Sequence, residues 1–352
     1  MKQPIRSVLR IAYRVSRYAS SVMRRASCAL RKRPRGKPAT SALTLAFCSS
    51  LVILCGCQPR HLYRETRVMM GTFIEVISPD ERSSAIAFEE IKRIESLLSK
   101  YDEHSEIYRL NKNGKITASP ETWYIMQRAR EFWKNSNGAF DITVGPLMNA
   151  WGFTDKRYTV PKKQEIKKAL RLVGMDKIIF HKNNNVIEFS IRGMSVDLGA
   201  IAKGFAIDSA IKKIKAAGVK NCLINAGGDI YCVGKKFGRP WKVAVQNPRG
   251  RSFLSTLRLE DSAIATSGDY EQYFKNKEEV FSHIFDPTTG APAQAGITSV
   301  TVIAQDCLTA DALATSVFVL GREKGTEMIK KYPPAKACIV ESNNEGELVT
   351  VP

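Results

Sequence analysis

The spacing of apolar and polar residues changes along the chain between the twofold period of strands and the longer period of helices. Alternation over residues 67–78 predicts a strand broken at Met70-Gly71-Thr72, and helical spacing predicts a helix over 85–100, followed by a loop to about residue 111. Further strands are expected at 177–181, 186–190, 222–224, 230–233, 241–246, 262–266, 280–285 and 298–304. Further helices are expected at 119–138, 161–174, 309–319 and 322–332. Strands alternating with scattered helices favour an α+β fold with mixed, largely antiparallel sheets and packed helices.

Residues 195–208 combine a strand pattern with a helix pattern. Apolar residues alternate with polar ones up to Leu198, the chain turns at Gly199, and a helix is expected to follow. Such a junction brings together the Asp197 carboxylate, free backbone amides at the positive end of the helix, and the Lys203 ammonium. This combination suits a phosphate-bearing ligand. A packed strand–helix junction with a surface lysine is the alternative.

The first 57 residues differ in composition from the rest. Residues 1–38 carry twelve Lys or Arg and no acid, and residues 41–56 are almost wholly apolar or small. This arrangement is typical of a signal sequence, because about 16 residues are too few for a stable transmembrane helix. The end of the apolar segment, Leu54-Cys55-Gly56-Cys57, resembles a bacterial lipobox, which implies a lipid on Cys57 and an anchored protein. An uncleaved anchor is the alternative, and translation could start at Met1 or at Met23.

Residues 58–65 are expected to form a polar linker, and residues 66–352 one large catalytic domain. Removing the twelve basic leader residues lowers the formal net charge from +20 to +8, so the basic composition does not indicate a nucleic-acid partner. The remaining cysteines show no CxxC spacing, which leaves a zinc or redox motif unsupported. Cys222 and Cys232 flank a glycine-rich turn, and this spacing is compatible with a disulfide or with two buried thiols. The sequence contains neither GxGxxG after a first strand nor a P-loop, which disfavours those nucleotide sites.

Several segments rich in Gly, Asp, Asn and Thr adjoin the apolar strands, and each alone is compatible with turn chemistry. Asp311 and Thr315 are four residues apart at a helix start, so the carboxylate and the hydroxyl point to the same side. With a backbone carbonyl they would form a hard oxygen site that suits Mg²⁺ beside substrate phosphates. His283, one of four histidines, is a candidate general base. The alternatives are an early-helix carboxylate, a core threonine and a structural histidine.

Eight segments follow one another over residues 66–341. They are Met70-Gly-Thr, Phe140-Asp-Ile-Thr-Val-Gly-Pro-Leu, Trp151-Gly-Phe, Asp197-Leu-Gly-Ala-Ile-Ala-Lys-Gly, Asn225-Ala-Gly-Gly-Asp, Thr266-Ser-Gly-Asp-Tyr, His283-Ile-Phe-Asp-Pro-Thr-Thr-Gly and Asp311-Ala-Leu-Ala-Thr. Together they resemble the ApbE family, the FAD:protein FMN transferases, which are often membrane-anchored bacterial lipoproteins. The resemblance implies a single ApbE-like, T-fold-like domain and agrees with the lipobox.

The resemblance also implies a reaction and a set of site residues. FAD is the implied substrate, and FMN is transferred with Mg²⁺ to a Thr or Ser hydroxyl of an acceptor protein through a phosphoester, with release of AMP. The metal is implied to be held by the Ala200 carbonyl, Asp311 and Thr315. Asp311 and His283 are the candidate catalytic residues, with His283 offered as the base for the incoming hydroxyl. The residues implied to border FAD are Met70, Tyr101, Ala139, Phe140, Asp141, Asp197, Lys203 and Phe285. The implied acceptor is a subunit of a membrane redox complex, and the implied location is the periplasmic face, with the inner membrane preferred over the outer.

Two other functions are compatible with the same residues. Water in place of the acceptor would make the protein a Mg²⁺-dependent FAD pyrophosphatase that forms FMN and AMP. A lipid-anchored protein that binds FAD without catalysis is the third possibility. The pair Asp311 and Thr315 argues against pure binding, because affinity alone does not require an open metal site.

Overall fold

The computed structural model describes residues 61–250, 252–342 and 348–351. The predicted signal sequence, Cys57 and the first linker residues lie outside these ranges. Among the described residues, no helix is both long enough and apolar enough to cross a membrane.

One eight-stranded sheet, with the strand order β1-β2-β6-β7-β10-β13-β14-β15, organises the described residues. All seven of its pairings are antiparallel. The strands are β1 (Tyr63–Met69), β2 (Thr72–Ser78), β6 (Cys222–Ala226), β7 (Asp229–Val233), β10 (Ser262–Gly268), β13 (Ile297–Ala304), β14 (Lys336–Glu341) and β15 (Leu348–Val351). The predicted α+β class with largely antiparallel sheets is therefore confirmed.

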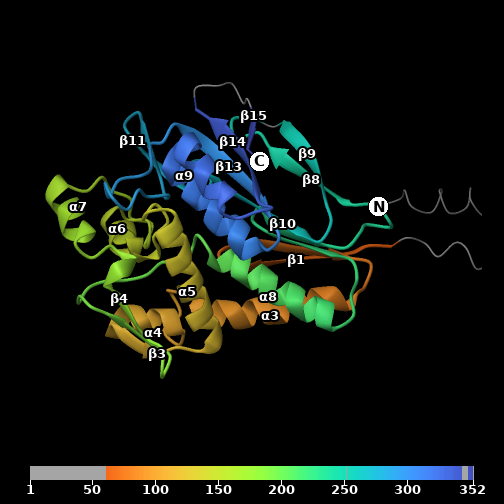
Figure 1. Cartoon of the computed structure of the whole chain (residues 1–352), viewed down its shortest axis with the longest axis horizontal. Coiled ribbons are helices and arrows are strands. Elements are labelled where there is room, and N and C mark those ends of the chain that lie inside the picture. The colour runs from red at the N-terminus through yellow and green to blue at the C-terminus, as the bar shows by residue number, and fades with distance from the viewer. Residues whose placement is uncertain (1–60, 251, 343–347, 352) are drawn as a thin grey trace, which may run out of the picture. The chain divides into compact units, whose positions relative to one another are not determined.

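Helices cover one face of this sheet (Figure 1). Helices α3 (Arg82–Leu98), α8 (Ala202–Ala216) and α9 (Cys307–Lys330) pack on the strands and on one another, and α5 (Pro120–Asn135) packs on α9. The apolar residues at helical spacing in α3, such as Ile91 and Ile94, are completely buried in this core. Burial of these apolar faces holds the helices on the sheet.

A hairpin of β8 (Trp241–Gln246) and β9 (Phe253–Leu259) covers the opposite face. Trp241 and Leu259 of the hairpin pack with Leu223 and Ile264 of the sheet. The sheet is therefore buried on both faces in its middle, and β13 is buried along almost its whole length.

Two smaller parts complete the described residues. A sheet of β3 (Lys115–Thr117), β5 (Val186–Phe189) and β4 (Ile178–His181) follows α4 (Glu106–Asn113). A separate aromatic cluster joins α6 (Gly145–Ala150), α7 (Lys163–Leu170) and the hairpin of β11 (Tyr273–Asn276) and β12 (Glu279–Ser282), which Figure 1 shows at the end opposite β8 and β9. Two 3₁₀ turns connect these elements: Ile142–Val144 leads into α6, and Met175–Lys177 lies between α7 and β4.

Three predictions of local structure need correction. Strand β1 starts at Tyr63, so the end of the expected linker already belongs to the sheet, and the break at Met70-Gly71 is the turn of a β1–β2 hairpin. The expected loop after residue 100 contains α4, which Ser105 caps by accepting a hydrogen bond from the Tyr108 amide at 2.9 Å. Strand β9 was not predicted, because its apolar residues do not alternate regularly with polar ones and only Leu259 is buried.

Residues 194–198 are extended and alternate in burial as expected, but they do not join a sheet. The Asn111 side chain of α4 binds both backbone groups of Val196, at 3.0 Å to its oxygen and 2.7 Å to its nitrogen. The Asp197 amide donates to the Ile142 carbonyl at 2.7 Å. The predicted strand is wrong, because single partners on other elements satisfy these backbone groups in place of a neighbouring strand.

Cys222 and Cys232 are free, buried thiols. The β6–β7 pairing sets Cys222 opposite Val233 and Leu223 opposite Cys232. Because successive residues face opposite sides of a sheet, Cys222 lies under the helices and Cys232 lies under the β8–β9 hairpin. The sheet itself separates the two sulfur atoms and prevents the disulfide.

Candidate functional site

The starts of α8 and α9 meet beside the sheet and bring distant sequence segments into contact. The Asp311 carboxylate of α9 accepts a hydrogen bond from the Gly204 amide of α8 at 3.2 Å. The same carboxylate lies 3.5 Å from the Lys203 ammonium. The carboxylate of the predicted metal site therefore adjoins the turn predicted to bind phosphate.

Two buried carboxylates share one lysine at this contact. Lys203 Nζ lies 2.8 Å from Asp229 Oδ2 and 3.5 Å from Asp311 Oδ2. Asp229 and Asp311 are only 1% and 3% exposed. Burial and the Asp229 charge raise the pKa of Asp311 to about 7. One ammonium does not balance two ionised carboxylates, so a further cation would relieve the repulsion between them.

The start of α8 has fewer unbound backbone N–H groups than the sequence predicts. Carboxylates already occupy one amide of the preceding turn and one amide of the helix: Gly199 N–H binds Asp197 at 2.8 Å, and Gly204 N–H binds Asp311. Lys203 is half-buried and paired, so the surface-lysine alternative is wrong. Although burial alone would lower it, Asp229 and Asp311 raise the pKa of Lys203 above its ordinary value. The helix start therefore offers fewer free donors to a phosphate than expected.

Asp197 is held on its other side by Lys100, at 2.6 Å. The Lys100 ammonium also lies 5.0 Å from the centre of the Tyr101 ring, and that ring is 66% exposed. Tyr101 thus presents an open aromatic face beside the Asp197 turn, as a stacking partner for a planar ligand would require.

Oxygen donors for a hard cation lie around Asp311. Thr315 follows one turn later in α9, with its hydroxyl 3.1 Å from that of Ser267 on β10. Ala200 lies just ahead of α8, and only its backbone carbonyl can contribute. Over the described ranges, no three or more His, Cys, Asp and Glu side chains cluster as a metal-binding group. This donor chemistry fits Mg²⁺, which binds to one or two carboxylates and completes its shell with water and phosphate oxygens.

His283 follows β12, and its ring is fixed by one hydrogen bond. Nδ1 lies 3.1 Å from the Gln272 carbonyl oxygen. Since a carbonyl can only accept, Nδ1 carries the proton and Nε2 carries a lone pair in the neutral ring. Burial, assisted by the charge of Lys203, lowers the pKa of His283 to about 4. The imidazole is therefore neutral at physiological pH, with Nε2 available to accept a proton.

Most of the other residues predicted to border FAD have partners within the protein. Met70 occupies the β1–β2 turn, and its amide donates to the Glu95 carboxylate at 2.6 Å. Ala139 is buried, and the Phe140 ring packs in the core against Phe132, 5.7 Å between ring centres. Asp141 accepts hydrogen bonds from the Thr143 amide and hydroxyl, at 2.7 and 2.6 Å. The structure thus uses the side chains of Phe140 and Asp141 internally, to close the turn that leads into α6.

Phe285 belongs to the separate aromatic cluster. Its ring centre lies 5.9 Å from that of Trp151 and 5.8 Å from that of Phe153, and the residue is 5% exposed. Phe285 therefore supports the segment that carries His283, and little of its ring remains to pack beside a nucleotide.

The sequence patterns assign no role to Asp229 or Lys100, both of which contact predicted site residues. For Asp229 no signal stood out, because Gly227-Gly228 followed by an aspartate is ordinary turn chemistry. Lys100 stands at the end of an ordinary amphipathic helix, and no motif marks it.

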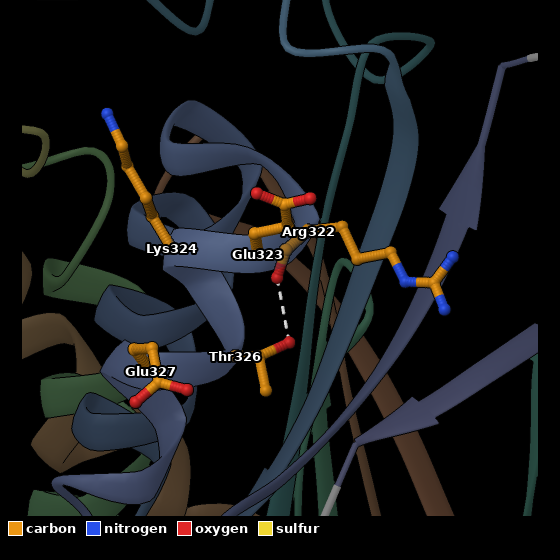
Figure 2. Close-up of a pocket in the computed structure, with 5 residues that line it drawn as sticks. All are labelled: Arg322, Glu323, Lys324, Thr326 and Glu327. Atoms are coloured by element: carbon orange, nitrogen blue, oxygen red, sulfur yellow. Dashed lines mark hydrogen bonds between the residues drawn. The ribbon is translucent and has the colours of Figure 1, made fainter.

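A surface hollow of about 420 Å³ lies elsewhere, lined by Arg322, Glu323, Lys324, Thr326 and Glu327. Figure 2 shows these side chains pointing apart around α9, with a hydrogen bond of 2.7 Å from Thr326 to the Arg322 carbonyl. All five residues follow Gly321 in α9, whereas Asp311 precedes it. The hollow is therefore not part of the candidate site.

Comparisons with known proteins show which family the chain resembles. The model of the ApbE family matches residues 70–340. A protein named FAD:protein FMN transferase from Haemophilus influenzae is 32% identical over 317 residues, covering 83% of this chain and 90% of that protein. Its namesake from Vibrio cholerae is 33% identical over 316 residues, covering 85% and 94%.

Solved structures share the fold. The ApbE protein from Thermotoga maritima superposes with a TM-score of 0.76 at 34% identity, covering 82% of this chain and 96% of that one. The flavin transferase ApbE from Vibrio cholerae gives a TM-score of 0.75 at 28% identity, covering 83% and 97%. The similarity thus extends over nearly all of each solved chain.

Proposed function

The chain belongs to the ApbE family, and we propose that it transfers FMN from FAD to a Thr or Ser hydroxyl of an acceptor protein, with Mg²⁺ and release of AMP. The observation that carries the proposal is the contact of Asp311 with Gly204 and Lys203 at the start of α8. This contact gathers oxygen donors and uncompensated negative charge where a cation–diphosphate complex would need them. The names of the relatives supply the reaction class.

In the proposed reaction, the acceptor hydroxyl oxygen forms a bond to the phosphorus of FMN, and the phosphoanhydride bond to AMP breaks. The electron pair of that bond leaves with AMP, and the hydroxyl proton passes to Nε2 of His283. The hydrogen bond from Nδ1 to Gln272 orients the ring for this transfer. With a pKa of about 4, His283 stays unprotonated at neutral pH and can accept the proton, as a weaker base than an ordinary histidine.

When bound, Mg²⁺ would neutralise charge on the diphosphate and on the departing AMP. Asp311, Thr315 and the Ala200 carbonyl are the residues that would hold it. Lys203 balances Asp229 beside them. The ion pair of Lys100 with Asp197, which is mostly buried on both sides, keeps the preceding turn in place.

The proposal extends to location and partner. A lipid on Cys57 would hold the domain at the periplasmic face of the inner membrane, where the acceptor would be a subunit of a membrane redox complex. The leader and the lipobox in the sequence support this part. Strand β1 begins at Tyr63, only six residues after Cys57, and six extended residues span about 20 Å. Such a short tether suits an acceptor that is itself in the membrane.

The test is to incubate the purified protein with FAD, Mg²⁺ and an acceptor that carries an exposed threonine. In-gel flavin fluorescence on the acceptor together with equimolar AMP is the expected result. Free FMN and AMP without labelling would instead identify a pyrophosphatase. FAD binding with neither product would identify a flavin-binding protein, and both outcomes would reject the transferase.

A further inference from the structure

Helices α8 and α9 each carry a carboxylate that binds backbone N–H groups of the other helix. Asp208 of α8 accepts hydrogen bonds from the backbone N–H groups of Cys307 and Leu308 in α9, both at 2.8 Å. One turn before Asp208, Gly204 donates its own N–H to Asp311, one turn further along α9. Each helix thus binds the main chain of the other through one carboxylate, and the two contacts lie a turn apart.

The two main chains touch at this point without side chains between them. A Cβ atom on Gly204 would lie 2.4 Å from the Cys307 carbonyl oxygen, so only glycine permits the approach. The first N–H groups of any helix lack partners within the helix. In α9, Asp208 binds the first two, and the N-cap Asp306 binds that of Thr309 at 2.8 Å. The start of α9 is therefore saturated, and the carboxylate of Asp208 is the group of α8 that binds its first two N–H groups.

We propose that Asp208 is a positioning residue for the cation-binding carboxylate. Its two hydrogen bonds fix α9 along α8, so that Asp311 stands at the Gly204 amide with Thr315 one turn beyond. The inference rests on the proposed function for the role of the cation. Groups that orient metal ligands from behind typically contribute 10–100-fold to metal affinity.

The experiment compares Asp208→Asn with the wild-type full chain by titration with Mn²⁺, which takes the same oxygen ligands as Mg²⁺. Free Mn²⁺ is measured by electron paramagnetic resonance, without FAD or acceptor. We expect the variant to bind Mn²⁺ about 10–100-fold more weakly. In FMN transfer, the Mg²⁺ concentration for half-maximal rate should rise by a similar factor, while the rate at saturating Mg²⁺ stays within about threefold.

Asp306→Asn is the matched control. It removes one charge and one carboxylate from the same helix start, but Asp306 has no hydrogen bond to α8 among the described contacts. We expect Asp306→Asn to lose about as much thermal stability as Asp208→Asn. Its Mn²⁺ affinity, in contrast, should stay within about threefold of the wild-type value. Equal weakening in both variants would reduce the effect to charge or helix stability and overturn the inference. Wild-type affinity in Asp208→Asn would overturn it as well.

Asp208→Glu is the substitute test variant if Asp208→Asn does not fold. It keeps the charge and the acceptors but lengthens the side chain by one methylene, which pushes α9 out of register. Mn²⁺ binding at least about fivefold weaker is expected, and unchanged binding overturns the inference. If the wild-type protein transfers no FMN but binds Mn²⁺ more tightly than the Asp208 variant, the proposed function is rejected and the positioning role stands. A wild-type protein that binds no Mn²⁺ overturns the positioning role.

Discussion

Asp311 combines burial with a neighbouring like charge, and this determines both its chemistry and its cost to folding. Burial and Asp229 raise its pKa to about 7, far above the 3.8 of an exposed carboxyl group. Between these two values the folded state binds more protons than the unfolded state, so the free energy of unfolding decreases as pH rises through this window. In the absence of a divalent cation, the ionised carboxylate is therefore destabilising above pH 7.

Asp311→Asn should therefore stabilise the protein while it abolishes function. Without divalent cations, we expect the variant to gain about 1–3 kcal/mol at pH 8 and almost nothing near pH 4, where Asp311 is protonated. FMN labelling should be lost at ordinary Mg²⁺. Urea unfolding at the two pH values measures the first effect and in-gel fluorescence the second. A variant that is less stable at pH 8, or that labels normally, would contradict the metal-ligand role.

His283→Ala separates proton transfer from binding. The variant should bind FAD within about threefold of wild type but transfer FMN about 10²–10⁴-fold more slowly, the usual contribution of a general base. Because the pKa of His283 is lowered to about 4, the acid limb of the wild-type rate profile should lie near that value and not near 6.5. His104→Ala, at a highly exposed ring, is the control. Loss of FAD affinity in His283→Ala would reject the base role.

At the residue scale, the sequence identified groups whose chemistry depends on short spacing. Asp311 and Thr315 are recognisable because four residues on a helix define one side. The sharing of Lys203 between Asp229 and Asp311 could not be predicted, since it depends on how α8, β7 and α9 meet. Burial also decides which aromatic rings remain available, and only Tyr101 among those predicted is exposed.

At the scale of elements, prediction succeeded where local chemistry and burial agree. Helix α5 starts with Pro120 after the N-cap Ser119, as predicted, because the cap satisfies an amide within the same segment. Helix α4 was missed although Ser105 caps it in the same way, because it has only eight residues and its buried face is small. Strand β9 was missed because its apolar residues do not alternate regularly with polar ones and only Leu259 is buried.

The interruption predicted between residues 319 and 322 is present inside α9, and it leads to a test. Gly321 adopts φ 80° and ψ 175°, a conformation essentially restricted to glycine. A Cβ atom there would meet nothing closer than 3.5 Å, so Gly321→Ala tests backbone conformation without a steric clash. We expect a loss of about 1–3 kcal/mol in urea unfolding and unchanged Mn²⁺ affinity, because Asp311 lies ahead of the break. Lys324→Ala, on the exposed side, is the control, and an unchanged stability of Gly321→Ala would contradict the strain.

At the scale of the whole molecule, the strand order assembles the site. Strands β7 and β10 are neighbours in the sheet although about thirty residues separate them in sequence, and Asp229 starts one where Ser267 nears the end of the other. Helices α8 and α9 then bring Lys203 and Asp311 to the same end. The sequence alone predicts the segments but not this order, because antiparallel strands can pair in many arrangements with similar local patterns.

The last prediction concerns the connection between the catalytic unit and the membrane. Cys57→Ser should remove the lipidation site and release the protein from the membrane fraction, because the lipid on Cys57 is the proposed anchor. Cys55→Ser, two residues earlier in the same leader, should leave anchoring unchanged. Fractionation of cells fed a clickable palmitate analogue measures both location and lipid. Cys57→Ser protein that remains in the membrane without lipid would show that the leader itself is an uncleaved anchor. Its catalytic rate on a soluble acceptor should equal that of wild type, because every site residue lies within Arg60–Pro352.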